Sequence, residues 1–168
     1  AVRVTDESGD WFYFAFPFLH TRVRATLHDL TSPASYEALT YDEAANEWRW
    51  QKNLPPTMQG DELKLLLSGK MKSGQARYHV KDVAKAKPVS LHGGNIEWNE
   101  FRKRWVLIGL QFGNKDDPSH LGEVWYAESE KPDGPWRKTI KVASHPRYSF
   151  YNPVHHAFLD ANGGRTIY

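Results

Sequence analysis

Short runs of β-branched and aromatic residues, separated by clusters of turn residues, recur along most of the chain, and this pattern is typical of β-strands. The run RWVLIGLQF is apolar almost throughout, which indicates a strand buried on both faces. Turn clusters such as DESGD, NEFRK, KPDGP and DANGG lie between the runs. The strands predicted in this way are Trp11–Phe16, Arg22–Leu27, Arg104–Phe112, Glu123–Ser129, Arg137–Ala143, Tyr151–Phe158 and Arg165–Tyr168.

The segment Met58–Arg77 departs from this pattern. It contains three leucines at helical spacing, Leu63, Leu66 and Leu67. Gly69 stands where a helix would end. We therefore predict a short amphipathic helix over residues 59–68, with a second turn near Ser73–Ala76. Two interpretations remain open, an insertion packed on a β body and a helix that binds a partner.

The chain also resembles itself. VTDESGDWFYFAF at 4–16 aligns with WNEFRKRWVLIGL at 98–110 with an offset of 94 residues, so that Trp11 falls on Trp105. A second alignment, of FLDANGGRTIY with WNEFRKRWVLI, has an offset of 61 residues. The two offsets differ by 33 residues, which the helical segment and its flanks at about 52–88 can supply. The chain thus contains about two and a half copies of one unit.

Each copy reads as four antiparallel strands, which in the second copy are His92–Trp98, Arg104–Phe112, Glu123–Ser129 and Arg137–Ala143. A four-stranded unit of about 60 residues is typical of a β-propeller blade. We therefore predict an all-β fold, a partial β-propeller with a blade at 1–50, a helical insertion at about 52–88, a blade at 90–145 and the start of a further blade at 148–168. Because a propeller closes only with more blades, the remaining blades of the same full-length chain are an expected partner. A generic antiparallel sandwich is the alternative.

Composition narrows the possible functions. The formal net charge is only +2, and no basic block suggests a nucleic-acid partner. No apolar run approaches the roughly 18 residues of a membrane span. The absence of Cys excludes disulfides and thiolate metal sites. Aromatic residues make up 14% of the chain, which suits a β-rich protein with sugar-binding surfaces, although a β core alone also accounts for them.

The segment YAESEKPDGPW, residues 126–136, resembles the hairpin between the two outer blade strands of five-bladed β-propeller glycoside hydrolases, the relatives of arabinanases, β-xylosidases and β-fructosidases. With LHGGNIEWNEFRKRWVLI and YSFYNPVHHAFLDANGG, it is still more similar to bacterial propeller proteins near those enzymes. The resemblance covers residues 90–168 well and residues 1–40 loosely. It implies a carbohydrate-active protein, outside the cell or in the periplasm, that needs no cofactor.

The resemblance also implies catalysis by carboxylates around a central funnel, formed by the connections between blades and by loops within them. Glu123 is the first candidate for an acid, with Asp116 or Asp117 as the second carboxylate. Glycoside hydrolysis requires two carboxyls about 5 to 9.5 Å apart. These acids can also be solvated loop residues. Candidate substrate-binding residues near this face are His92, Asn95, Arg22, Arg24, Tyr151, Asn152 and His155.

Arg22 and Arg24 flank Val23, so they share one face of a strand and can clamp the carboxylate or sulfate of an acidic sugar. Protection of an edge strand by charge explains them equally well. His155 and His156 are adjacent and point to opposite faces of an extended strand. With no HxH or HExxH spacing, we expect no metal site.

Three tryptophans, Trp98, Trp125 and Trp136, can stack on sugar rings or fill the space between blades. The KPDGP segment is expected to be a connection between strands rather than a site. The sequence therefore favours a glycoside hydrolase-like propeller that acts on a poly- or oligosaccharide. A non-catalytic propeller module that binds a glycan or a protein is the alternative, and a scaffold domain is a third possibility.

Overall fold

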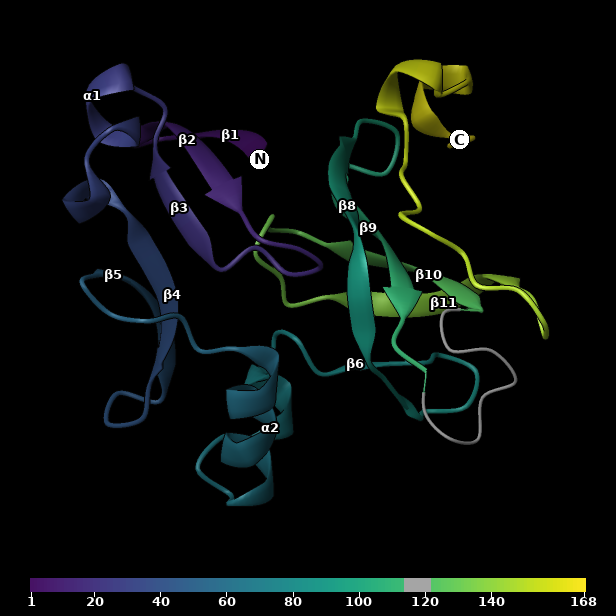
Figure 1. The fold of residues 1–168 in the computed structure, drawn as a ribbon, viewed down its shortest axis with the longest axis horizontal. Coiled ribbons are helices and arrows are strands. Elements are labelled where there is room, and N and C mark those ends of the chain that lie inside the picture. The colour runs from purple at the N-terminus through teal and green to yellow at the C-terminus, as the bar shows by residue number, and fades with distance from the viewer. Residues whose placement is uncertain (114–121) are drawn as a thin grey trace. The chain divides into compact units, whose positions relative to one another are not determined.

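Antiparallel β-sheet is the main regular secondary structure, as the runs of β-branched and aromatic residues predict. The structure is a computed structural model that describes residues 1–113 and 122–168. These residues form two compact units, Ala1–Tyr78 and His79–Tyr168. Each unit is built around one sheet in which every strand pairs with its neighbour along the chain (Figure 1).

The first unit contains a five-stranded sheet in the order β1-β2-β3-β4-β5. Its strands are β1 (Val2–Asp6), β2 (Gly9–Phe14), β3 (Thr21–Arg24), β4 (Glu37–Asp42) and β5 (Glu47–Lys52). Between β3 and β4 the chain forms the short helix α1 (Leu27–Leu30) and a 3₁₀ turn at Pro33–Ser35. Beyond β5 lie α2 (Gln59–Leu67) and a 3₁₀ turn at Ser73–Gln75. The predicted helix and the turn that follows it are therefore both confirmed.

The side of α2 that packs on the unit matches the leucine spacing only at Leu66. Leu65 and Leu66 pack near Tyr41 and Met71, whereas Leu63 and Leu67 are exposed. The cause is a buried carboxylate on the same helix. Glu62 is buried, and its side chain accepts hydrogen bonds from the backbone N–H groups of residues 77 and 78, at 2.6 Å and 3.0 Å. These bonds orient the helix so that Glu62 faces inward.

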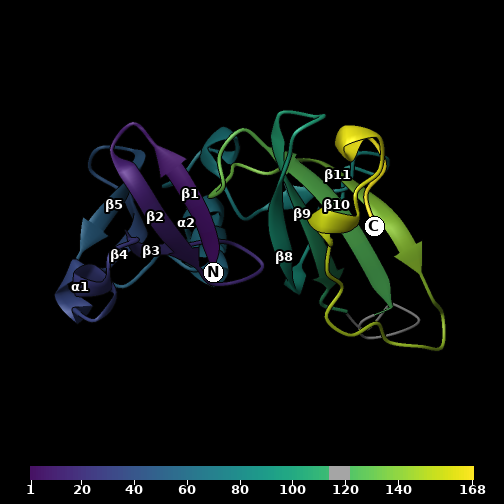
Figure 2. The same cartoon turned by 90° about the horizontal axis from the view of Figure 1, so that it is seen from above.

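The second unit contains a four-stranded sheet in the order β8-β9-β10-β11, whose strands lie side by side with a pronounced twist (Figure 2). Its strands are β8 (Leu91–Asn99), β9 (Arg104–Gln111), β10 (Glu123–Ser129) and β11 (Arg137–Ser144). All four strands expected between residues 92 and 143 are therefore present, with small shifts at their ends. A two-stranded ribbon, β6 (Val80–Lys81) with β7 (Pro88–Val89), precedes them.

The internal repeat extends to the pairing of individual residues. In the β1–β2 hairpin Val4 pairs with Trp11, and in the β8–β9 hairpin Trp98 pairs with Trp105. Each member of the first pair corresponds to the residue 94 positions later in the second pair, 4 to 98 and 11 to 105. The neighbouring pairs Val2–Tyr13 and Ile96–Leu107 obey the same offset, and all four of these residues are buried. The two hairpins therefore share both register and buried face.

The C-terminal segment differs from the prediction. No strand forms at Tyr151–Phe158 or at Arg165–Tyr168, and the chain makes 3₁₀ turns at Ala157–Leu159 and Asn162–Gly164 instead. Left-handed backbone angles at Asn152, Asn162, Gly163 and Gly164 interrupt extended geometry. The apolar and aromatic residues of this segment resemble a strand pattern, but its backbone bonds within the segment, as from the N–H of His156 to the carbonyl of Tyr168 at 2.7 Å, and to side chains of β8, and no strand forms.

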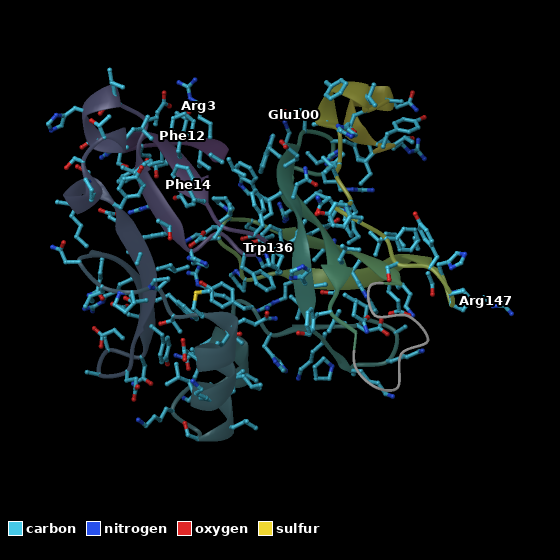
Figure 3. All side chains as sticks on the ribbon, viewed as in Figure 1. Arg3, Phe12, Phe14, Glu100, Trp136 and Arg147 are labelled. Carbon is cyan, nitrogen blue, oxygen red and sulfur yellow. The ribbon has the colours of Figure 1, made fainter. Side chains whose placement is uncertain are left out.

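The KPDGP segment joins β10 to β11, as expected from its turn residues. Gly134 has a φ of +87°, a conformation that suits glycine because it has no Cβ. Trp136, which follows, is only 2% exposed and anchors the beginning of β11. Figure 3 places Trp136 and Arg147 at opposite ends of β11.

Candidate functional site

Glu123 is the first residue of β10, where the sequence places a candidate acid. Its side chain is buried and forms an ion pair with Lys141 of β11. Asp116 and Asp117, its expected partners, lie outside the residues that the structure describes. The structure therefore provides one member of the expected carboxylate pair, and that member already has a cationic partner.

The position of Lys141 follows from an irregularity in the pairing of β10 with β11. Val124 pairs with Ala143 and Trp125 pairs with Lys141, so one extra residue of β11 bulges between the two pairs. The ammonium group of Lys141 lies 5.5 Å from the ring centre of Trp125. Trp125 itself is buried and donates a hydrogen bond of 2.8 Å from Nε1 to the side chain of Gln111. Its position supports sheet packing rather than stacking on a ligand.

The structure brings two other candidates together, Asn95 of β8 and His155 of the C-terminal segment. Nδ2 of Asn95 donates to the carbonyl of His155 at 3.0 Å, and Oδ1 accepts from its N–H at 2.8 Å. The His155 ring is buried, with Nε2 2.8 Å from a carboxylate oxygen of Asp160. Both candidates make internal contacts, which hold the C-terminal segment on the second unit.

The remaining candidates of the second unit lie at the surface. His92 is exposed on β8, and its ring meets that of Phe112 edge-on at 5.7 Å. Tyr151 is 85% exposed, and Asn152 is exposed beside it. These exposed side chains are accessible to a ligand. The role of the three residues in substrate binding stays a prediction.

Arg22 and Arg24 belong to the first unit and do share one face, as the alternation with Val23 predicts. The guanidinium of Arg22 lies between the rings of Trp11 and Trp50, at 4.2 Å and 4.6 Å from their centres. Its Nε donates to a carboxylate oxygen of Glu37 at 2.7 Å. Arg24 lies 4.1 Å from the centre of the Trp11 ring and donates to the carbonyl of Ser8. Both cations already have partners, so a clamp on an acidic sugar stays a prediction for them.

A pocket that the sequence did not indicate lies at the other end of β10, on its connection to β11. Its volume is about 400 Å³, within the range of roughly 300–1,000 Å³ that is usual for small-ligand sites. Four cationic and two anionic side chains line it, Arg104, Lys131, Arg137, Lys138, Glu128 and Glu130. We refer to it as the β10–β11 pocket.

Glu128 is the most constrained charge of this pocket. It accepts a hydrogen bond of 2.7 Å from the hydroxyl of Tyr126 and pairs with Lys138 at 2.9 Å. Burial raises the pKa of Glu128, but the hydrogen bonds from Tyr126 and Lys138 outweigh burial, so the pKa lies below its ordinary value. Burial, and then the bond to Glu128, raise the pKa of Tyr126. Glu128 is thus a fixed anion and Tyr126 a neutral donor.

A second bulge explains why consecutive cations reach the same pocket. Tyr126 pairs with Ile140 and Glu128 pairs with Arg137, so β11 has one more residue than β10 between these pairs. Lys138 lies in the bulge with a left-handed φ of +51°. Neighbours on a regular strand point to opposite faces, whereas here both Arg137 and Lys138 line the pocket.

A second pocket, of about 520 Å³, lies between β4 and α2 in the first unit. Its charges are matched in pairs, with Lys70 at 2.9 Å from Glu43 and Lys64 at 3.0 Å from Asp61. It therefore offers a ligand less unpaired charge than the β10–β11 pocket.

Within residues 1–113 and 122–168, no group of three or more His, Asp or Glu side chains is placed to hold a metal ion. In the same ranges no helix is both long and apolar enough to cross a membrane. No protein-family model, curated protein or solved structure matches the chain.

Proposed function

We propose that this protein is a carbohydrate-binding β-propeller protein and that the 168 residues form part of the propeller. The observation that carries this proposal is the repeated hairpin, in which the register of β1–β2 recurs in β8–β9 after 94 residues. Propellers are built by repetition of such antiparallel units. The four-stranded order of β8 to β11 is the strand count of one blade.

A carbohydrate is favoured as the ligand by two further observations. The hairpin YAESEKPDGPW resembles that of propeller glycoside hydrolases, and it encloses the β10–β11 pocket. The pocket is large enough for a small ligand and is rich in hydrogen-bonding side chains, which sugar hydroxyls require.

Glycoside hydrolysis is the second candidate function, and the position of Glu123 favours it. Its side chain is a buried carboxylate at the beginning of a strand, only 9% exposed, and general acid catalysis uses carboxyls in such surroundings. We rank binding first because the described carboxylates Glu123, Glu128 and Glu130 each contact a lysine or an arginine.

The test is a screen of the protein against neutral and acidic plant and algal polysaccharides, with binding and release of reducing sugars measured separately. Binding without release supports the first candidate. Release that is lost in Glu123→Gln but kept in the control Glu97→Gln, on β8, supports hydrolysis. If no polysaccharide is bound or cleaved, the proposed function is wrong.

A further inference from the structure

We propose that the β10–β11 pocket recognises the negatively charged group of an acidic sugar, a uronate carboxylate or a sulfate ester, through Lys131 and Arg137. This inference rests on the proposed carbohydrate function and specifies the class of sugar. It assigns binding of the acidic group to residues of the second unit, instead of to Arg22 and Arg24 of the first.

The balance of charge in the pocket carries the argument. Arg104 lies 3.2 Å from Glu130, and Lys138 lies 2.9 Å from Glu128. These two pairs use both carboxylates that line the pocket. Lys131 and Arg137 remain, and neither makes an ion pair among the residues that the structure describes. The pocket therefore has a surplus of two positive charges.

The chemistry of the two cations suits an oxyanion. One guanidinium nitrogen of Arg137 donates to the carbonyl of Trp136 at 3.2 Å. A guanidinium carries five N–H donors in a rigid fork, so others remain for two oxygens of one carboxylate or sulfate. Lys131 adds a point charge with three donors.

The bulge in β11 brings these charges into one place. Arg137 and Lys138 are consecutive, yet the left-handed φ of Lys138 lets both line the pocket. Lys138 then neutralises Glu128, which would otherwise repel an anion beside Arg137. The arrangement thus leaves Arg137 available to a ligand.

The experiment measures binding by isothermal titration calorimetry. The acidic probes are tetragalacturonate and a sulfated galactan tetrasaccharide, and their matched neutral probes are the methyl-esterified and the desulfated forms. Inorganic sulfate is included because a free anion offers the same charge without a sugar. The variant Lys131→Gln/Arg137→Gln is compared with Lys85→Gln/Lys87→Gln, which loses the same charge from exposed positions of the second unit.

We expect at least one acidic tetrasaccharide to bind more tightly than its neutral form and than sulfate, and its Kd to rise about tenfold or more in the pocket variant but not in the control. Equal binding of acidic and neutral forms, or an unchanged Kd in the pocket variant, overturns this inference while the carbohydrate function stands. Binding of sulfate as tight as that of the tetrasaccharides also overturns it, because the sugar then contributes nothing. Failure to bind any saccharide overturns the proposed function itself.

Discussion

The side-chain amide of Asn95 bonds to both backbone polar groups of His155, 60 residues further along the chain. A neighbouring strand would satisfy the backbone with its own N–H and C=O groups. Here the side chain of Asn95, on β8, makes both of these bonds instead. The C-terminal segment is attached to β8 at Asn95 and again at Asn99, whose Nδ2 donates to the carbonyl of Gly164 at 2.8 Å.

Replacing Asn95 by Ala should destabilise the protein by about 1–3 kcal/mol, because two hydrogen bonds are lost and the partly buried backbone groups of His155 keep no replacement. Urea denaturation measures the change. His92→Ala, an exposed position on the same strand, is the control and should change stability by less than about 0.5 kcal/mol. Equal effects at the two positions would contradict the attachment.

Arg22→Lys should lower the free energy of unfolding by about 1–2 kcal/mol although the charge is kept. The planar guanidinium stacks between Trp11 and Trp50 while it bonds to Glu37, and an ammonium group cannot do both. Arg3→Lys, at a position whose side chain is 65% exposed, should stay within about 0.5 kcal/mol of the parent protein. A neutral result at Arg22 would mean that the stacking contributes little.

The lowered pKa of Glu128 predicts how the stability of the protein depends on pH. Its pKa in the folded protein is lowered from the ordinary value of 4.5, so its contribution to stability is complete above that value and is lost as the pH falls further. The stability difference between the parent protein and Glu128→Gln should therefore be largest near pH 7 and shrink below about pH 4.5. Denaturation at several pH values tests this, with the exposed Glu7→Gln as the control. A difference that grows on acidification would contradict the lowered pKa.

Gly94→Ala should destabilise the second unit by about 3 kcal/mol or more, because a Cβ at residue 94 would lie 2.0 Å from the carbonyl oxygen of Ile108. Gly93→Ala is the matched control. It too has a positive φ, but its Cβ would meet nothing within 4 Å, so the cost should be about 1 kcal/mol. Thermal or urea unfolding separates the two, and a similar loss in both would show that backbone strain rather than the close approach is responsible.

Signals in the sequence predicted the four strands of the main sheet of the second unit, β8 to β11. Glu123–Ser129 was predicted with its observed bounds, because an apolar and aromatic run lies between turn residues. The predicted strands do not include β1, β4 or β5 of the first unit, and the strand predicted at Arg22–Leu27 ends at Arg24, before helix α1 begins at Leu27. In EWRWQK the two tryptophans alternate with polar residues, a period of two that could have identified β5.

The packing side of α2 and the β10–β11 pocket required the structure. Leucine spacing alone does not reveal that Glu62 turns inward to bind backbone N–H groups. Sequence alternation likewise places Arg137 and Lys138 on opposite faces, and only the bulge brings them together. Asp116 and Asp117 remain candidates that the described residues do not test.

The pairing of every strand with its neighbour along the chain has a consequence for how the molecule forms. The five-stranded and the four-stranded sheets are simple meanders, so each can grow by successive closure of short loops, and contacts of this kind favour fast folding. The attachment of His155 to Asn95 closes a loop of 60 residues and gains nothing until β8 exists. We therefore expect the C-terminal segment to dock last, and to be the first part of the second unit to detach when the protein unfolds.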